Sequence, residues 1–337
     1  MSTIIDFATI NVIHSKHAYE EIPHYKPKLG ISACLLGNAV RFDAGHKRDV
    51  FLTDTFSQYV EWISVCPEIA LGIGLPREPV RLVGNLAEPR MIAERSGKDW
   101  TSAMRAFAIK RAKELKRLDL SGYVFKKNSP SCGIERVRNY NSKGTPMRQG
   151  RGLFAAAIME RFPLMPVEEE GRLNDPVLRE NFIERVFAYR RWQTLTQAKS
   201  VRALVEFHTS HKFLLLAHSE QHYRRLGRLV AAAGQPSVTQ AYEIYGRGFM
   251  DSLTVHASAK KHSNVLEHMM GYFSKELSNT ERQELIELIS DFRKQLVPLI
   301  VPVTLMRHYV RKYDVKYLQN PLYLEPSPKE LMLRNHV

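Results

Sequence analysis

The segment Lys28–Cys34, with the sequence KLGISAC, indicates the fold of the first half of the chain. Its first five residues form a short run with strand character, and a cysteine follows almost directly. Further along, similar runs alternate with stretches of helical periodicity. The expected strands are Lys28–Ser32, Ile63–Val65, Val80–Val83 and Ser121–Phe125, and the expected helices are Leu52–Trp62 and Ala103–Leu118. This alternation predicts an α/β domain with a mostly parallel sheet and flanking helices.

The sequence pattern changes near Met165. The stretch MPVEEEGRLNDPVLRENF (165–182) carries two prolines, a glycine and an acidic run, which fits either a domain edge or an internal surface loop. Nearly everything after it has helical periodicity, so the second half should be an all-α helical bundle. The expected helices are Glu180–Ser200, Ala203–Leu216, Glu220–Ala233, Val238–Ala257, Lys260–Phe273, Thr280–Pro298 and Val303–Tyr313.

These changes divide the 337 residues into four parts, and the length fits two domains. The parts are an N-terminal extension (1–25), the α/β domain (26–165), a connecting segment (166–194) and the all-α domain (195–337).

The chain is basic, with 49 Lys and Arg against 35 Asp and Glu and a formal net charge of +14. Such a balance favours a polyanionic partner such as nucleic acid, although a merely basic soluble protein remains an equal alternative. The N-terminal residues lack the pattern of a secretory signal, and no stretch is apolar enough to span a membrane. We therefore expect a soluble, cytoplasmic protein.

The three cysteines, Cys34, Cys66 and Cys132, each lie just past an expected strand. An odd number in a long chain argues against a disulfide framework. The carboxyl ends of parallel strands meet at one edge of a sheet, so the three thiols could converge there. Soft thiolates favour an iron–sulfur cluster, zinc or Cu(I), and three ligands without a fourth would leave one metal position open. Three unrelated buried cysteines are the alternative.

Three sequence blocks around these cysteines resemble the signature motifs of the thiouracil desulfidase family. They are SACLLGNAVRFD (32–43), CPEIALGIGLPREP (66–79) and KKNSPSCG (126–133), within a match of roughly residues 26 to 165. The resemblance implies that Cys34, Cys66 and Cys132 hold a 4Fe-4S cluster with one open iron, which binds the substrate sulfur. It also implies that Glu68 and Ser129 are catalytic.

One departure from the family pattern follows the first block. The family usually has Gly-Gly after the R-[FY]-D step, whereas this chain has Ala44-Gly45. Alanine would be strained there if the backbone requires a positive φ.

The motif residues also have plainer interpretations. Glu68 follows Pro67 and could simply favour the N-terminus of a helix, and Ser129 could cap a turn at Pro130. Arg41, Asp43 and Lys126 lie in or beside the motifs and are candidate substrate-binding residues, or only solvated loop charges.

The second half carries basic residues interleaved with tyrosine and histidine, as an RNA-binding face requires, although a solvated helix face would have the same pattern. The candidates are Arg224, Arg225, Arg228, Lys260, Lys261, Arg307 and Arg311. From about residue 195 to 330 this half resembles the YbgA-like helical domain. That resemblance implies a tRNA-binding domain and 4-thiouridine as the substrate.

The motifs together predict an iron–sulfur-dependent, non-redox desulfidase that converts a thiolated uridine in tRNA to uridine and releases hydrogen sulfide. The alternatives are a desulfidase of free 2-thiouracil-type bases and a non-catalytic RNA-binding protein. Neither a membrane nor a DNA partner is expected, and the sequence does not indicate an oligomeric state.

Overall fold

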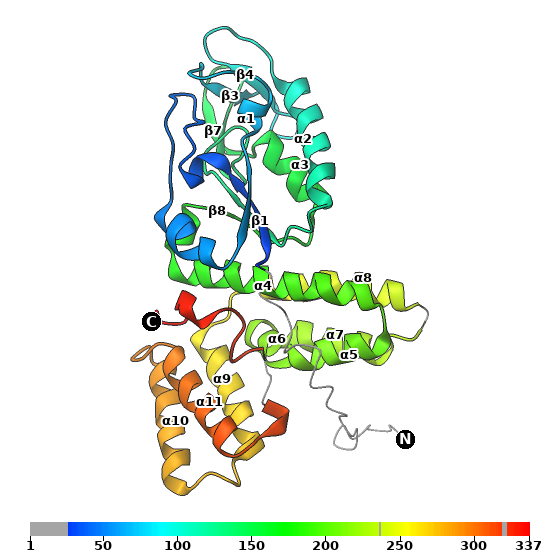
Figure 1. The fold of residues 1–337 in the computed structure, drawn as a ribbon, viewed down its shortest axis with the longest axis vertical. Helices are drawn as coiled ribbons and strands as arrows, with labels where there is room; N and C mark the ends of the chain where they lie inside the picture. Colours follow the sequence, from blue (N-terminus) through cyan, green and yellow to red (C-terminus); the bar gives the residue numbers. More distant parts are fainter. Residues whose placement is uncertain (1–25, 236, 319–321) are drawn as a thin grey trace.

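An α/β domain packs against a helical domain, with one long helix lying between them (Figure 1). The structure is a computed structural model that describes residues 26–235, 237–318 and 322–337. The expected extension at 1–25 lies outside the described residues. The predicted fold class, a parallel α/β domain followed by a largely helical region, is confirmed.

Sheet A corresponds to the mostly parallel sheet that the sequence predicts; all its pairs are parallel, and the strand expected at Val80–Val83 lies in another sheet. Its strands are β1 (Lys28–Ser32), β2 (Glu61–Val65), β5 (Gly122–Phe125) and β8 (Val167–Glu169), in the order β2-β1-β5-β8. Gly30 pairs with Tyr123 across β1 and β5, and a Cβ atom on Gly30 would lie 2.1 Å from the Tyr123 ring. Only glycine therefore lets this large ring pack against the central strand.

Both faces of sheet A are covered, which explains why its strands are buried. On one face Tyr123 and Phe125 pack with α2 (Thr101–Lys116) and α3 (Leu153–Arg161). On the other face Leu29 and Ile31 pack with short helical turns and with the long helix α4 (Pro176–Ala198). Parallel sheets with both faces covered are the normal arrangement of α/β proteins.

The helix expected at Leu52–Trp62 is too long. The chain forms a π-helical turn, η3 (Phe51–Thr55), and a 3-10 turn, η4 (Phe56–Gln58), and then enters β2. Trp62 belongs to that strand and pairs with Leu29. The strand pairing with β1 therefore outweighs the local helical pattern.

A second sheet, sheet B, was not expected. It consists of β3 (Val80–Val83), β4 (Arg90–Ala93), β6 (Val137–Tyr140) and β7 (Pro146–Gly150), in the order β4-β3-β6-β7. β3 runs parallel to β6, and the two outer pairs are antiparallel. The inner residues Leu82 and Val137 join the core that α2 and α3 share with sheet A.

The segment expected to connect the domains, 166–194, is an ordered part of both of them. Its acidic run forms β8, and the carboxylates are used internally: Glu169 accepts from the backbone N of Ile134 at 2.8 Å, and Glu168 pairs with Arg172 at 2.7 Å. The remainder forms η5 (Arg172–Asn174) and most of α4, whose first two free backbone N–H groups are capped by Asp175.

Helix α4 belongs to two hydrophobic cores. Phe182, Ile183 and Val186 pack with the strands of sheet A, whereas Trp192 and Leu195 pack in the helical domain. The domain boundary therefore runs through the middle of a continuous helix.

The helical domain contains two bundles, each with its own core. The first packs α5 (Val201–Ser210), α6 (Lys212–His218), α7 (Glu220–Ala231) and α8 (Val238–Thr254) against α4, and the second contains α9 (Ala259–Met270), α10 (Asn279–Arg293) and α11 (Ile300–Lys312). The helix expected at Ala203–Leu216 is two helices that meet at His211. No helix among residues 26–235, 237–318 and 322–337 is long and apolar enough to cross a membrane.

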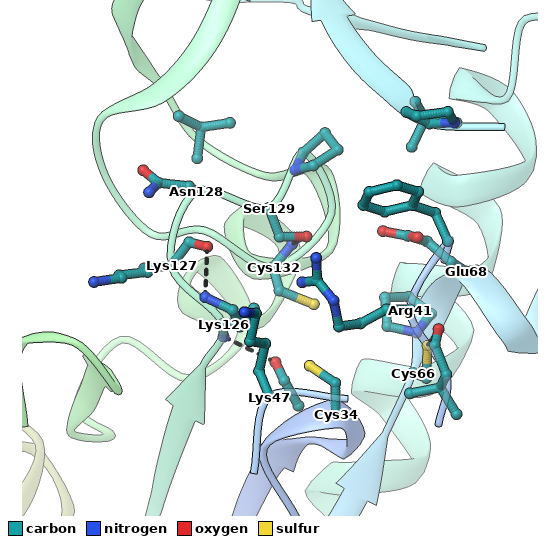
Figure 2. Close-up of a pocket in the computed structure, with 18 of the residues that line it drawn as sticks. Cys34, Arg41, Lys47, Cys66, Glu68, Lys126, Lys127, Asn128, Ser129 and Cys132 are labelled. Carbon is teal, nitrogen blue, oxygen red and sulfur yellow. Dashed lines mark hydrogen bonds between the residues drawn. The ribbon is translucent and has the colours of Figure 1, made fainter. Parts of the chain in front are cut away.

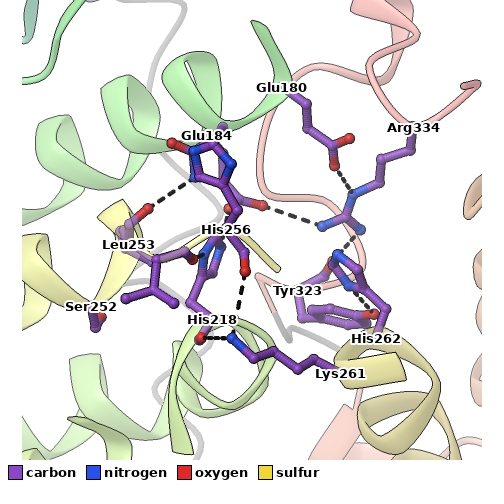
Figure 3. A network of polar contacts seen from close by, with 12 residues as sticks. Glu180, Glu184, His218, Ser252, Leu253, His256, Lys261, His262, Tyr323 and Arg334 are labelled. Carbon is purple, nitrogen blue, oxygen red and sulfur yellow. Dashed lines mark hydrogen bonds and ion pairs between the residues drawn. The ribbon is translucent and has the colours of Figure 1, made fainter. Parts of the chain in front are cut away.

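Residues near the C-terminus return to α4. Leu331, in the short turn η8 (Lys329–Leu331), joins the core beneath sheet A. The buried guanidinium of Arg334 pairs with Glu180 at 3.2 Å and with Glu184 at 3.3 Å (Figure 3). Burial alone would raise the pKa of Glu184, but His218 and Arg334 outweigh it and lower the pKa to about 2.

Ala44 adopts a φ of +56°, so the strain expected at this departure from the family pattern is present. Ala44→Gly should stabilise the protein by up to about 1 kcal/mol, because the left-handed conformation costs an L-residue about 1–2 kcal/mol and glycine's lost backbone freedom costs less. Urea unfolding measures the change. The matched control Ala106→Gly, in the exposed face of α2, should instead destabilise by about 1 kcal/mol. A destabilised Ala44→Gly variant would contradict the strain at this position.

Candidate functional site

The three cysteines follow three adjacent strands of sheet A. Cys34 lies in the turn η2 (Ala33–Leu36) directly after β1, Cys66 directly follows β2, and Cys132 lies in the loop after β5. All three line one cavity of about 450 Å³. Figure 2 shows the sulfur atoms of Cys34 and Cys132 directed toward each other, with Cys66 on the other side of Arg41. The convergence expected at the carboxyl edge of a parallel sheet is therefore found in the structure.

The Cys132 loop is held from two sides. The Ser129 hydroxyl accepts hydrogen bonds from the backbone N atoms of Ser131 and Cys132, at 3.2 and 3.1 Å. The carbonyl of Ser131 in turn accepts from two N–H groups in the first turn of α3, those of Phe154 and Ala155. A Cβ atom on Gly152 would lie 2.5 Å from the Ser131 carbonyl, so the close approach of this loop to α3 requires glycine.

The thiols are protonated near neutral pH when no metal is bound. Burial raises the pKa of Cys34 to about 11, and burial also raises the pKa values of Cys66 and Cys132. Repulsion between the thiolates themselves adds to the shift at Cys34 and at Cys132. Three thiolates in one cavity therefore need a bound cation to exist together, which is the situation that a metal centre provides.

Glu68 lies in the first turn of α1 (Pro67–Ala70), beside the thiols, and is held by two partners. Arg77 donates to Oε2 through Nε at 3.1 Å and through Nη2 at 2.5 Å. The Ser131 hydroxyl donates to Oε1 at 2.7 Å. The Glu68 side chain is only 15% exposed and Arg77 only 4%, so this charge pair is fixed in direction.

Ser129 lines the cavity and also caps its own turn, so both interpretations of this residue find support in its position. Its oxygen already accepts two backbone hydrogen bonds. A hydroxyl has two acceptor lone pairs and one proton, so what remains is a donor.

The expected substrate-binding residues are only partly brought together. Arg41 and Lys126 line the cavity, but Asp43 does not. The exposed carboxylate of Asp43 accepts from the backbone N of Gly45 at 3.1 Å and pairs with Arg41 at 3.4 Å. Lys126 pairs with the largely buried Glu170 at 2.5 Å, so a protein carboxylate holds its ammonium group in place.

Three residues of the site were not assigned their roles from the sequence. Arg77 and Ser131 orient Glu68, and Glu170 holds Lys126 together with the backbone N of Lys127 at 2.8 Å. Arg77 and Ser131 stand inside the motif blocks, which is a signal that could have found them. Glu170 belongs to the acidic run interpreted as a domain edge, so only the pairing of β8 with β5 reveals it.

The donor set of the cavity consists of three thiols, which are the soft ligands that an iron–sulfur cluster takes. Within the described ranges, no three His, Cys, Asp or Glu side chains lie close enough together to hold one metal ion. A zinc ion requires its thiolates at about 2.3 Å from one centre. A cluster binds each thiolate to a different metal atom and so accepts ligands that are farther apart.

The basic residues expected to bind RNA lie on separate helices. Arg224, Arg225 and Arg228 are on α7 in the first bundle, whereas the other four are on α9 and α11 in the second. None of them lines the cavity, and these helices lie on the opposite side of α4 from sheet A (Figure 1).

Three of these basic side chains have internal partners. Arg224 pairs with Glu220 at 2.6 Å, Lys261 donates to the carbonyl of His218 at 2.6 Å, and Arg307 pairs with Glu325. The side chains of Arg225, Arg228, Lys260 and Arg311 are exposed.

Comparison with known proteins covers both halves. Residues 29–170 match the 2-thiouracil desulfurase family, and residues 212–328 match DUF1722, described as a protein of unknown function. The chain joins a 2-thiouracil desulfurase domain to a YbgA-like DUF1722 domain. This confirms both resemblances found in the sequence.

Two relatives each cover one half of the chain. The uncharacterized protein YbgA of Escherichia coli (strain K12) is 34% identical over 153 residues, which are 45% of this chain and 90% of YbgA. The uncharacterized protein YbbK of Bacillus subtilis (strain 168) is 29% identical over 150 residues, 43% of this chain and 97% of YbbK. A solved structure, the [4Fe-4S]-dependent thiouracil desulfidase TudS, is 30% identical and covers 44% of this chain and 94% of its own, with a TM-score of 0.37.

The raised pKa of Cys34 predicts the pH dependence of its alkylation in the metal-free desulfurase domain. Because only the thiolate reacts, the rate of iodoacetamide labelling should rise about tenfold per pH unit and level off only near pH 11. Mass spectrometry of the Cys34 peptide gives this rate. In unfolding concentrations of urea, the labelling rate of the same peptide should level off near pH 9, which is the ordinary pKa of a thiol. A plateau below pH 9 in the folded protein would contradict the prediction.

Proposed function

We propose that this chain is a 4Fe-4S-dependent desulfidase that replaces the sulfur of a thiolated uridine in tRNA, 4-thiouridine in the first place, by oxygen. The observation that carries the proposal is the gathering of Cys34, Cys66 and Cys132 around one cavity with Glu68 beside them. Membership of residues 29–170 in the 2-thiouracil desulfurase family supports the reaction class.

The three cysteines would hold the cluster, since they are the soft donors of the cavity. Bound through three protein thiolates, a 4Fe-4S cluster supplies one iron that can act as a Lewis acid toward a thiocarbonyl sulfur.

Glu68 takes a proton from the attacking water. Its carboxylate keeps accepting capacity on Oε1, which accepts one hydrogen bond from Ser131 and has two lone-pair sites, whereas Oε2 already accepts two hydrogen bonds from Arg77. Arg77 fixes the carboxylate plane, and the remaining donor of Ser129 is available to the water or to the base. The overall change is C=S plus water giving C=O plus hydrogen sulfide, so no electrons are transferred.

A polynucleotide substrate agrees with the charge of the protein. The net charge of +14 favours a polyanion, and Arg225, Arg228, Lys260 and Arg311 present exposed cations on the YbgA-like domain. A base in folded RNA must leave its stack to reach the cavity, at a cost of a few kcal/mol. Phosphate contacts elsewhere on the RNA can offset that cost.

The direct test is incubation of the anaerobically prepared protein with thiolated tRNA and, separately, with free 4-thiouracil. Nucleoside analysis should show uridine in place of 4-thiouridine, with hydrogen sulfide formed in equal amount. Cys34→Ser, Cys66→Ser and Cys132→Ser should each lose both iron and activity, because two thiolates do not retain the cluster. Conversion of the free base alone would favour a free-base desulfidase. An iron-free protein without either activity would favour the non-catalytic alternative.

Glu68→Gln should keep the iron content and visible absorbance but lower kcat by about 10²- to 10⁴-fold, because the amide keeps the shape of the side chain and cannot accept the proton. The matched control is Glu94→Gln, which removes the other carboxylate that lines the cavity but does not contact Arg77 or Ser131. We expect the control to stay within a few-fold of the unmodified protein. Equal losses in the two variants would show that the proton acceptor lies elsewhere.

A further inference from the structure

Three arginines form a row across sheet B, here called the arginine row: Arg81 on β3, Arg138 on β6 and Arg148 on β7. Arg138 lies directly opposite Arg148 in the antiparallel pair. The parallel pairing of Leu82 with Asn139, continued by one residue, places Arg81 beside Arg138. Because side chains alternate along a strand, the three arginines share one face while Asn139, next to Arg138, is buried on the other.

This face of sheet B forms a wall of the cavity that holds the cysteines. Arg81, Arg138 and Tyr140 all line the cavity, and the guanidinium of Arg81 lies 5.0 Å from the centre of the Tyr140 ring. The arginine row therefore begins in the cavity and continues outward across the strands of sheet B to the exposed Arg148 on β7.

The charges of the row are not balanced by the protein. Among the described residues, none of the three arginines has a carboxylate within ion-pair distance, and the buried Nε of Arg81 has no hydrogen-bond partner. Glu94 also lines the cavity without pairing with any of them. Like charges directly opposite each other on neighbouring strands are destabilising. An anion that lies across the row would remove this repulsion.

We propose that the arginine row binds the phosphate groups next to the target base, so that the desulfurase domain itself docks the polynucleotide at the cavity. Guanidinium groups match phosphate oxygens in pairs, and a row on adjacent strands suits successive anionic groups. Tyr140 supplies an aromatic face beside the row for a base or ribose. The inference rests on the proposed action on a thiolated uridine and names the surface that receives it.

The position of the row distinguishes it from the basic residues of the YbgA-like domain. Those residues lie on α7, α9 and α11, away from the cavity, and can only contact distant parts of an RNA. The arginine row lies where the phosphates flanking the reacting nucleotide must pass. The same phosphate chemistry could be presented by a 5′-monophosphate of the free nucleoside or by the RNA backbone.

The first experiment measures binding of unmodified tRNA by fluorescence anisotropy over a series of KCl concentrations. Arg138→Gln combined with Arg148→Gln should lower the slope of log Kd against log salt by about 1.4 to 1.8, because each lost phosphate contact removes about 0.7 to 0.9. The matched control, Lys110→Gln with Lys113→Gln, removes the same charge from the exposed face of α2 outside the cavity and should lower the slope far less. Equal slopes in the two double variants would overturn the inference.

The second experiment compares kcat/KM for 4-thiouridine, its 5′-monophosphate and thiolated tRNA. In the arginine double variant, kcat/KM for the phosphate-bearing substrate, divided by kcat/KM for the nucleoside, should fall about tenfold or more. A fall for the monophosphate indicates contact with the phosphate of the reacting nucleotide, and a fall for tRNA alone indicates the flanking backbone. A uniform loss on all three substrates, or none, would overturn the inference. Failure of the unmodified protein to convert thiolated tRNA would count against the proposed function, whereas the binding slope is measured without turnover.

Discussion

The parallel pairing of β2, β1 and β5 is the constraint on which the site depends. Each of these strands ends in a loop that carries one cysteine, and the common direction of the strands places the three loops at one edge of sheet A. A shift of one residue in the register of either pairing would move the core-facing side chains of the shifted strand to the opposite face of the sheet. Gly30 leaves room for the Tyr123 ring between β1 and β5. It therefore maintains the pairing that positions the three thiols, although it does not contact them.

The three loops also supply each other's partners. Arg77 belongs to the second cysteine motif, yet it donates to the Val40 carbonyl in the first motif at 3.0 Å as well as to Glu68. Ser131, beside the third cysteine, binds the other oxygen of Glu68. The Glu68–Arg77 pair thus ties all three loops together, since Glu68 accepts from the third loop and Arg77 donates to the first, by charge-assisted hydrogen bonds that are about twice as strong as neutral ones. Its orientation is set before any substrate arrives.

The sequence predicted those parts of the fold whose local pattern and tertiary environment agree. β1 and β3 have the predicted bounds: most of β1 is buried in sheet A, and β3 buries Leu82 in the core. Trp62 was assigned to a helix because its pairing with Leu29 is not visible locally. β7 and β8 were missed for a similar reason, since one is rich in polar residues and the other is acidic, and each is a strand only through its neighbours. The same limit applies to the site: motifs indicated the cysteines, but the pairing of Lys126 with Glu170 joins residues 44 positions apart in the chain.

The continuous helix α4 has a consequence for the way the whole chain denatures. Phe182 and Ile183 are covered by sheet A, Trp192 is covered by the first helical bundle, and Leu331 and Arg334 bind back to the same helix from the far end of the chain. Unfolding of either domain would expose apolar side chains of α4, and the other domain also packs against this helix. The two domains, although they match separate families, are therefore coupled through α4, and we expect a change that loosens the packing of the helical half on this helix to lower the stability of the half that carries the thiols.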